Sequence, residues 1–287
     1  MSRSRSCENI RVFYLVAWAG ERKLNPLDLA QRFAESYLRF PAGAVHELTL
    51  IVSGTPDQAQ TTELVSLFGG APVSVIHVQD VDFDIGKYRF ALETTNFDLC
   101  CFLNSYSIIR APGWLKNLSD CALDPGVGIV GATASYESLF SGAVAGMTAR
   151  KPSLSMLRHG VPGAVKYWAY FPAFPNPHIR TNAFMMRRDV YQRVRWPRNP
   201  SRLETFRFES GRQSLTRQVL KMGLAAVIVG RDGRRYDVSD WPSSGTFRQS
   251  EQDNLLFDDN HTIEYCTAAA ERRRQLAAAA WGANAAE

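Results

Sequence analysis

Polar side chains follow a short apolar segment near the middle of the chain. Five apolar residues, Leu99 to Leu103, are followed directly by Asn104, Ser105 and Tyr106. A continuous apolar run of this length predicts a strand that is buried on both faces. Ligands of open α/β sheets bind at the carboxyl ends of such strands. We therefore expect a ligand near these three residues, with a plain turn after the strand as the alternative.

A second polar segment precedes another apolar run, Ala183 to Met186. It contains His178, Arg180 and Asn182. The guanidinium fork of Arg180 matches the oxygens of a phosphate group. The alternative is that His178 is a structural loop histidine and that Arg180 is a surface charge.

The elements that must position these residues alternate between strands and helices. We expect strands over residues 11–16, 48–52, 73–78, 99–103 and 127–131, with helices between them, one of them over residues 86–92. This alternation predicts a doubly wound, mainly parallel α/β sheet for residues 10–135. The later elements expected are a strand over 183–186, helices over 189–194 and 209–222, a strand over 224–229 and a helical tail over 262–281.

The segment 136–182 breaks this pattern because it is rich in proline and aromatic residues. Such a segment is either a long loop that covers a ligand or a disordered linker, and its aromatic content argues against disorder. We expect one domain over 1–240, with 136–182 as a cleft-covering segment. A polar C-terminal segment and helix, 241–287, would pack on the same domain.

Composition limits the classes of protein that the chain could belong to. The net charge of +5 is too small and too dispersed to indicate nucleic-acid binding, although it suits an anionic small ligand. The five cysteines show no C-x-x-C spacing, which argues against a zinc site or a disulfide framework and favours the cytoplasm. Arg3, Arg5 and the apolar run 12–20 loosely imitate a signal peptide, but Glu8 and Arg11 interrupt it. No segment has the length of a membrane span.

Motifs for several other chemistries are missing from the sequence. It has no G-x-S-x-G elbow, no phosphate-binding G-x-x-x-x-G-K-[ST] loop and no H-E-x-x-H. No G-x-G-x-x-G follows the first expected strand, which disfavours a dinucleotide-dependent dehydrogenase.

The order of these segments over residues 10–235 resembles that of the GT-A-fold nucleotide-sugar glycosyltransferases, especially the family-2-like inverting enzymes. In that family the buried strand is followed by Asp-x-Asp, whose carboxylates hold a divalent metal on the sugar diphosphate. Asn104-Ser105-Tyr106 occupies this position here, as a degenerate version of the motif. The resemblance implies Mg²⁺ or Mn²⁺, but these ions prefer anionic oxygens that neither Asn104 nor Tyr106 supplies.

The resemblance also implies roles for other polar residues in binding the two sugars and the nucleotide. The segment 176–187 matches one that lies beneath the donor and acceptor sugars, where Asn182 would bond sugar hydroxyls. The candidates for donor or nucleotide binding are Asp84, Asn104, Ser105, Tyr106, Arg180, Asn182 and Arg248, and those for donor or acceptor contact are Glu137 and His178. Asp82 is a rival to Asp84, and a simple helix cap is the alternative for either.

A glutamate is the implied catalytic base. Family members carry an acidic pair at the start of a helix, and its carboxylate takes the proton of the acceptor hydroxyl. Glu209 matches this position, although Ser210 replaces the second acid. Glu204 is the rival, and a plain partner of the helix dipole is the structural alternative for Glu209.

The function implied is therefore the transfer of a sugar, with inversion, from a nucleotide-sugar donor to a glycan or lipid-linked saccharide hydroxyl. We expect a cytoplasmic enzyme without nucleic-acid partners, and peripheral association with a membrane stays open. A GT-A-like module that binds sugar or nucleotide without transferring it is the alternative. A nucleotidyltransferase is a weaker one, because the segment 18–23 only faintly imitates a phosphate-binding loop.

Overall fold

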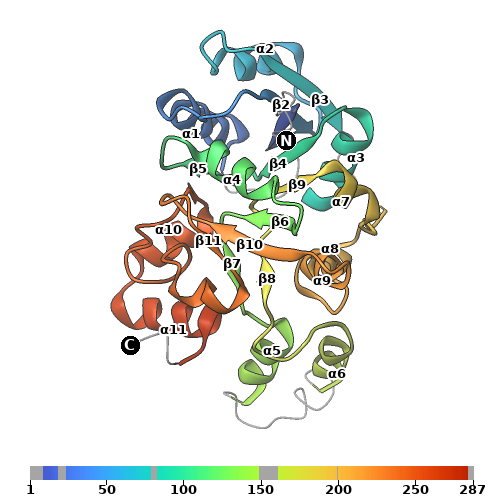
Figure 1. Cartoon of the computed structure of the whole chain (residues 1–287), viewed down its shortest axis with the longest axis vertical. Coiled ribbons are helices and arrows are strands. Elements are labelled where there is room, and N and C mark those ends of the chain that lie inside the picture. The colour runs from blue at the N-terminus through green and yellow to red at the C-terminus, as the bar shows by residue number, and fades with distance from the viewer. Residues whose placement is uncertain (1–8, 19–23, 79–82, 149–160, 199, 284–287) are drawn as a thin grey trace, which may run out of the picture.

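A computed structural model describes residues 9–18, 24–78, 83–148, 161–198 and 200–283 of the chain (Figure 1). Three features discussed above lie outside the described residues. They are the arginines of the signal-like segment (Arg3 and Arg5), most of the faint phosphate-loop imitation (19–23) and Asp82.

Eight strands form one central sheet in the order β11-β10-β6-β9-β4-β1-β2-β3. Its strands are β1 (Ile10–Ala17), β2 (Glu47–Ser53), β3 (Val73–Val78), β4 (Leu99–Leu103), β6 (Val127–Gly131), β9 (Ala183–Arg187), β10 (Ala225–Val229) and β11 (Arg235–Tyr236). β9 is antiparallel to both of its neighbours and β11 is antiparallel to β10, whereas the other paired strands are parallel. The prediction of a mainly parallel sheet is confirmed.

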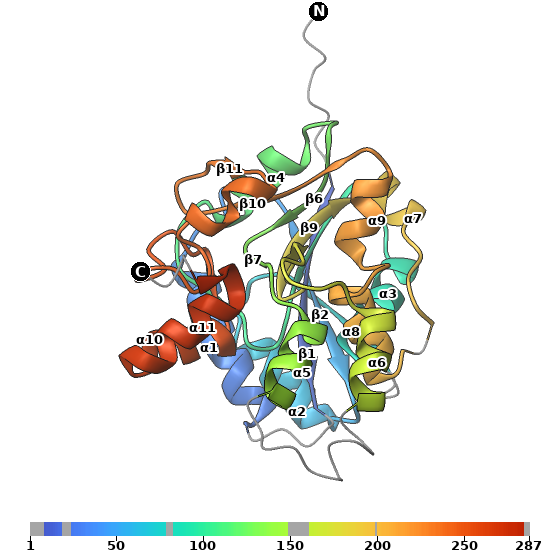
Figure 2. The same ribbon diagram turned by 90° about the horizontal axis from the view of Figure 1, so that it is seen from below.

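Helices cover both faces of this sheet (Figures 1 and 2). One face carries α1 (Pro26–Arg39), α2 (Gln58–Ser66) and α4 (Trp114–Ala122), and the other carries α3 (Asp84–Thr94), α7 (Arg188–Arg193), α8 (Arg202–Ser210) and α9 (Leu215–Lys221). Side chains alternate across β1 accordingly: Val12 and Tyr14 belong to one core cluster, and Phe13 and Leu15 to the other. The predicted doubly wound arrangement is confirmed.

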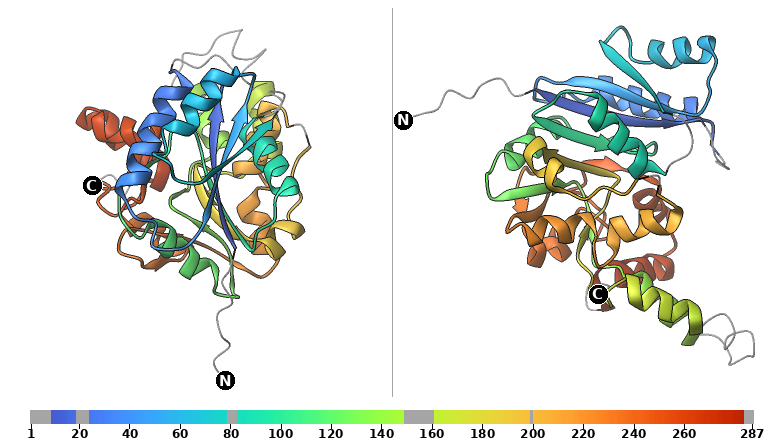
Figure 3. Two further views of the ribbon diagram at one scale, coloured as in Figure 1. Left: turned by 90° about the horizontal axis from the view of Figure 1, so that it is seen from above. Right: turned by 90° about the vertical axis from the view of Figure 1, so that its right-hand side faces the viewer.

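The segment 136–182 contains helices where a long loop was expected. α5 (Leu139–Thr148) and α6 (Val161–Tyr170) pack against each other at the end of the molecule opposite α2 (Figure 3). The prolines suggested a loop, but Pro162 lies in the first turn of α6, where a helix tolerates proline. Two short strands, β7 (Ala134–Ser135) and β8 (His178–Ile179), pair where this segment leaves and rejoins the sheet.

The helix expected over 209–222 is two helices, α8 and α9. Ser201 and Glu204 form a capping box that starts α8 early, and α8 ends before Gly211. A side chain at Gly211 would place its Cβ 2.5 Å from the carbonyl oxygen of Arg207. Ser214 then caps α9. Glu209 therefore lies in the last turn of a helix, and the idea that it partners the positive end of a helix dipole is wrong.

The C-terminal segment contributes two helices and one short strand. α10 (Asn260–Thr267) and α11 (Ala270–Trp281) replace the single helix expected over 262–281. The segment reaches α10 through a 3₁₀ helix (Val238–Ser243) and β12 (Phe257–Asp258), which pairs with β5 (Ile108–Ile109) just after β4. The indole of Trp281 donates to the carbonyl oxygen of Phe247 at 2.6 Å, so α11 is tied to the segment that precedes it. Among the described helices, none combines the length and apolar content needed to cross a bilayer.

One prediction concerns the end of β6, where a glycine permits β8 to approach. A Cβ at Gly131 would lie 2.6 Å from Cγ2 of Ile179, so Gly131→Ala should destabilise the fold by about 1–3 kcal/mol. Gly142→Ala is the matched control, because apart from its chain neighbours and the backbone of α5 no described atom lies within 4 Å of its Cβ position. It should leave the melting temperature unchanged or raise it. Equal melting temperatures for the two variants would contradict this packing.

Candidate active site

The direction of β9 brings three polar segments together at one edge of the sheet. Because β9 is antiparallel to β4 and β6, its first residues lie beside the last residues of both neighbours. The backbone amide of Asn104 donates to the carbonyl oxygen of Asn182 at 2.9 Å, and that of Ala132 donates to the carbonyl oxygen of Ala183 at 3.0 Å. The residues that follow β4 and β6 therefore meet the residues that precede β9.

A cavity of about 1180 Å³, called the central cavity below, opens at this edge. It is lined by most of the residues singled out from the sequence, namely Asp84, Asn104, Tyr106, Glu137, His178, Arg180, Asn182 and Glu209. Ser105 lines a smaller neighbouring cavity of about 290 Å³, together with Tyr106. The volume of the central cavity is sufficient for a ligand larger than most drug-sized molecules.

Asn104 holds a turn after β4. Its side-chain Oδ1 accepts hydrogen bonds from the amide of Tyr106 and the hydroxyl of Ser107, both at 3.1 Å. This is the plain turn that was the alternative from the sequence. The turn nevertheless lies on the wall of the central cavity, so a structural role and a ligand-binding role for Asn104 are compatible.

The same contacts argue against a metal ion at this position. Residues 104–106 supply no carboxylate, and the amide oxygen of Asn104 already accepts two hydrogen bonds. Within the described ranges, no group of three or more His, Cys, Asp or Glu side chains could hold a metal. These residues do not fit Mg²⁺ or Mn²⁺, and we assign no step to a metal ion.

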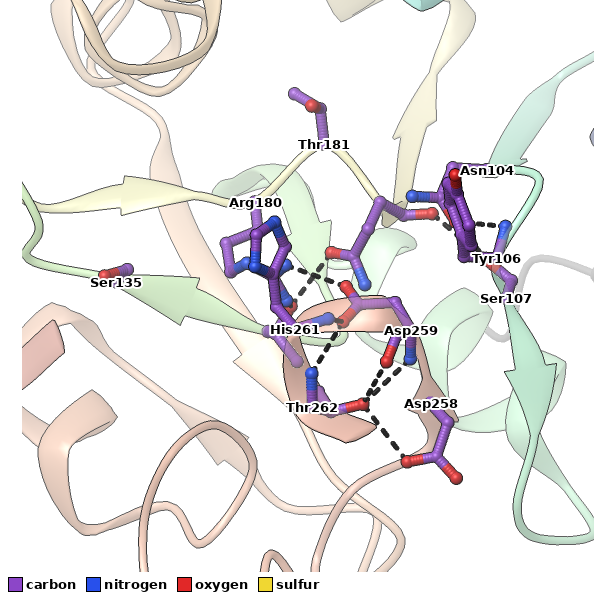
Figure 4. A network of polar contacts seen from close by, with 12 residues as sticks. Asn104, Tyr106, Ser107, Ser135, Arg180, Thr181, Asp258, Asp259, His261 and Thr262 are labelled. Atoms are coloured by element: carbon purple, nitrogen blue, oxygen red, sulfur yellow. Dashed lines mark hydrogen bonds and ion pairs between the residues drawn. The ribbon is translucent and has the colours of Figure 1, made fainter. Parts of the chain in front are cut away.

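Arg180 is fixed by a buried ion pair with Asp259 (Figure 4). The two side chains approach to 2.8 Å, and the carboxylate of Asp259 is 0% exposed. The guanidinium also lies 4.1 Å from the centre of the Phe247 ring. Burial alone would raise the pKa of Asp259, but the charge of Arg180 and the backbone amide of Thr262 bring that pKa below its ordinary value. A phosphate at Arg180 would have to compete with this carboxylate.

Arg248 forms a second ion pair, with Glu137, at 2.7 Å. Arg248 is 5% exposed, whereas Glu137 lines the central cavity. The predicted contact between Arg248 and a phosphate would therefore require its guanidinium to exchange one anionic partner for another. Glu137 is also held by the hydroxyl of Ser135, at 3.1 Å.

Two histidines of the central cavity are neutral. Burial lowers the pKa of His178, and its Nδ1 lies 2.8 Å from the carbonyl oxygen of Asn176. A carbonyl can only accept, so Nδ1 carries the proton and Nε2 is the acceptor. Partial burial and the charge of Arg180 also lower the pKa of His261. Neither ring adds a positive charge to the cavity at neutral pH.

Glu209 has the properties of a proton acceptor that works near neutral pH. Burial raises the pKa of its carboxyl group to about 7, and nearby Asp84 contributes to this increase. The hydroxyl of Thr181 donates to its Oε1 at 2.6 Å and, with the charge of Arg180, opposes the increase. A carboxylate with this pKa is a strong enough base to take a proton and yet is ionised in about half of the molecules at pH 7.

Glu204, the rival to Glu209, has a structural role. Its Oε2 accepts hydrogen bonds from the amide and hydroxyl of Ser201 in the capping box of α8. These bonds lower the pKa of its carboxyl group. Glu204 does not line the central cavity. It lines another cavity, on the other side of α8.

Sequence reasoning assigned no role to two residues that organise the site. Thr181 lies within the polar segment before β9 and holds Glu209. Asp259 belongs to the polar segment after the sheet, but its pairing with Arg180 joins positions far apart in the chain. Residue spacing carries no signal for such a pair.

Comparisons with known proteins give structural neighbours only. No family model matches the chain, and no curated protein matches its sequence. A mannosyltransferase from Pyrobaculum calidifontis, solved with GDP-mannose and Mn²⁺, is 13% identical, with a TM-score of 0.47 over 82% of this chain and 58% of that one. A mycobacterial protein is 17% identical, with a TM-score of 0.45 over 84% of this chain and 72% of that one.

A third neighbour is the glucosyl-3-phosphoglycerate synthase of Mycobacterium tuberculosis, solved with Mn²⁺, UDP and phosphoglyceric acid. It is 17% identical, with a TM-score of 0.37 over 65% of this chain and 58% of that one. The chain thus spans little more than half of the length of the two named transferases. Because these TM-scores are below 0.5, we base the function proposed below on the geometry of the site.

The buried ion pair gives a prediction for stability. Asp259→Asn removes the buried charge but keeps the side-chain oxygen that caps α10, and it leaves the largely buried guanidinium of Arg180 without its carboxylate. We expect a loss of about 3–5 kcal/mol in the free energy of unfolding, measured by denaturant titration at pH 7. Asp258→Asn is the control, because its partner Arg110 is more exposed and the loss should stay near 1 kcal/mol or less. Similar losses for both variants would contradict the importance of the buried pair.

Proposed function

We propose that this chain is a GT-A-fold, family-2-like glycosyltransferase that moves a sugar from a nucleotide-sugar donor to a hydroxyl group, with inversion. The observation that carries the proposal is Glu209, a carboxyl group with a pKa of about 7 on the wall of a large cavity at the carboxyl edge of the sheet. A hydroxyl is a poor nucleophile until a base takes its proton, and Glu209 is suited to that step.

The reaction proposed is a single displacement. Glu209 accepts the proton of the acceptor hydroxyl while the acceptor oxygen forms a bond to the anomeric carbon of the donor sugar. The bond between that carbon and the phosphate oxygen breaks, and its electron pair leaves with the nucleoside diphosphate. Attack on the face opposite the leaving group inverts the configuration at this carbon.

Asn182 is the residue best suited to hold a sugar hydroxyl. Its side-chain Oδ1 accepts a hydrogen bond from Thr133 at 2.9 Å, but its buried Nδ2 has no hydrogen-bond partner among the described residues. A buried donor without a partner is costly, and a ligand oxygen in the central cavity would satisfy it. Asp84, Asn104 and Tyr106 lie on the same cavity wall and are our candidates for the rest of the donor.

Arg180 is our candidate for stabilising the leaving diphosphate, since it is the arginine of the predicted donor set that lines the central cavity. Its guanidinium has several N–H donors in one plane, so it can bind a phosphate while it stays paired with Asp259.

Arg248 and Ser105 stay in the proposed donor set as supporting residues. Glu137 and His178 are proposed contacts for the donor or for the acceptor, a glycan or lipid-linked saccharide. The protein would work in the cytoplasm.

The second candidate function is a module that binds a sugar nucleotide without transferring the sugar. Both arginines proposed for the diphosphate are already paired with carboxylates, and the position of the metal-binding motif lacks anionic side chains. Calorimetry combined with product analysis distinguishes the two functions. Donor binding without release of nucleoside diphosphate, with and without Mn²⁺, would favour the binding module.

Glu209→Gln tests the base directly. With a panel of nucleotide sugars and saccharide acceptors, release of nucleoside diphosphate should fall about 100-fold or more, because glutamine cannot accept the proton. Glu204→Gln is the matched control on the same helix and should retain activity near that of the wild type. Equal activity of the Glu209 variant and the wild type would exclude Glu209 as the base.

Thr181→Val tests how the pKa of the base is set. The hydrogen bond from Thr181 lowers the pKa of Glu209, so its removal should raise that pKa above its value of about 7. Since the base acts when deprotonated, kcat/KM of the wild type should rise with pH to a plateau, with a midpoint near 7. The midpoint should move to higher pH in the variant. A midpoint that stays in place, or moves to lower pH, would contradict this assignment.

A further inference from the structure

A second cavity, of about 640 Å³, lies on the other side of α8 from the central cavity. We call it the basic cavity, and its walls come from α8, α9 and the ends of α6 and α7, which gather on one side of the molecule in Figure 2. Arg207 and Phe208 of α8 line the basic cavity, whereas Phe206 and Glu209 line the central one. The two cavities therefore share α8 as a wall but expose different side chains.

Positive charge dominates the lining of the basic cavity. Its cations are Arg193, Arg195, Arg207, Arg212 and Lys221. Among the described residues of the lining, Glu204 is the one carboxylate, and the capping box of α8 already engages it. Across the described part of the chain, no ion pair within 4.0 Å joins these five cations to a carboxylate.

Neutral groups hold two of these arginines in place. The Nε and Nη2 atoms of Arg212 donate to the carbonyl oxygen of Trp168, at 3.3 and 3.0 Å. The guanidinium carbon of Arg207 lies 4.3 Å from the centre of the Tyr170 ring. A carbonyl and an aromatic ring orient a guanidinium without neutralising its charge. These two arginines are therefore ordered and still able to bind an anion.

We propose that the basic cavity binds a ligand that carries a phosphate group. Arginine forks match phosphate oxygens, and several of them in one cavity of this volume suit a small phosphorylated ligand or headgroup. The phosphate can belong to a soluble molecule or to a lipid headgroup. Trp168, whose carbonyl oxygen holds Arg212, is 58% exposed, and Val165 of the same helix is 59% exposed. Exposed apolar side chains on this helix suit contact with a lipid surface. This inference does not depend on the proposed glycosyl transfer.

The test compares three variants with the wild type by calorimetric titration with inorganic pyrophosphate. Arg193→Gln/Arg195→Gln removes two exposed charges from the basic cavity. Arg39→Gln/Arg234→Gln removes two exposed charges elsewhere and is the matched control. Arg180→Gln reports on the central cavity. Each variant is first checked for an unchanged melting temperature or, failing that, for an unchanged circular dichroism spectrum at the titration temperature.

We expect the titration to show a pyrophosphate site whose affinity falls about tenfold or more in the Arg193/Arg195 variant and is unchanged in the other two variants. A separate site that depends on the proposed role of Arg180 would be lost only in Arg180→Gln and would leave this site in place. A parallel arm measures sedimentation with phosphatidylcholine vesicles, with or without phosphatidylglycerol. Loss of sedimentation with the anionic vesicles in the Arg193/Arg195 variant alone would support the proposal with the phosphate on a lipid. Three results would overturn the proposal. They are an equal loss of binding in the Arg39/Arg234 control variant, a loss of binding in Arg180→Gln alone, and no binding of pyrophosphate or of anionic vesicles by the wild type.

Discussion

The antiparallel insertion of β9 between β4 and β6 is the constraint on which the site depends. Hydrogen bonds from Asn104 to Asn182 and from Ala132 to Ala183 fix the register of this strand at its first residues. A parallel strand at this place would deliver its preceding segment to the opposite edge of the sheet. Because β9 runs the other way, Arg180, Thr181 and Asn182 reach the carboxyl ends of their neighbours.

The charged residues of the proposed site are of two kinds. Arg180 and Arg248 lie close to carboxylates, so their positive charges are compensated within the protein. The carboxyl group of Glu209 instead accepts a hydrogen bond from a neutral hydroxyl, and burial raises its pKa. A largely desolvated carboxyl group whose charge is not compensated by an ion pair is typical of a functional site. This contrast is why the proposed function is built on Glu209.

Local sequence patterns predicted the mainly parallel sheet and seven of its eight strands, all except β11, because apolar runs followed by polar residues mark strand ends. Most of the candidate residues named from these strand ends line the central cavity, and their roles stay predictions. The bounds of the helices were less predictable. Glu209 was expected at the start of a helix, but the capping box at Ser201 starts α8 earlier and the break at Gly211 ends it, so Glu209 lies in the last turn. The helices within 136–182 were missed because the prolines of this segment also suit a loop. Pairings such as Arg180 with Asp259 depend on tertiary structure, and no spacing in the sequence encodes them.

The pKa of Glu209 provides the most direct test of its proposed role as the base. It can be measured in the intact protein from the side-chain carboxyl ¹³C signals of labelled glutamate as the pH is changed. We expect one signal to titrate with a pKa of about 7 and to be missing from the Glu209→Gln variant. If every glutamate of the folded protein titrated near the ordinary value of about 4.3, Glu209 would be an ordinary acidic side chain, and its assignment as the base would be wrong.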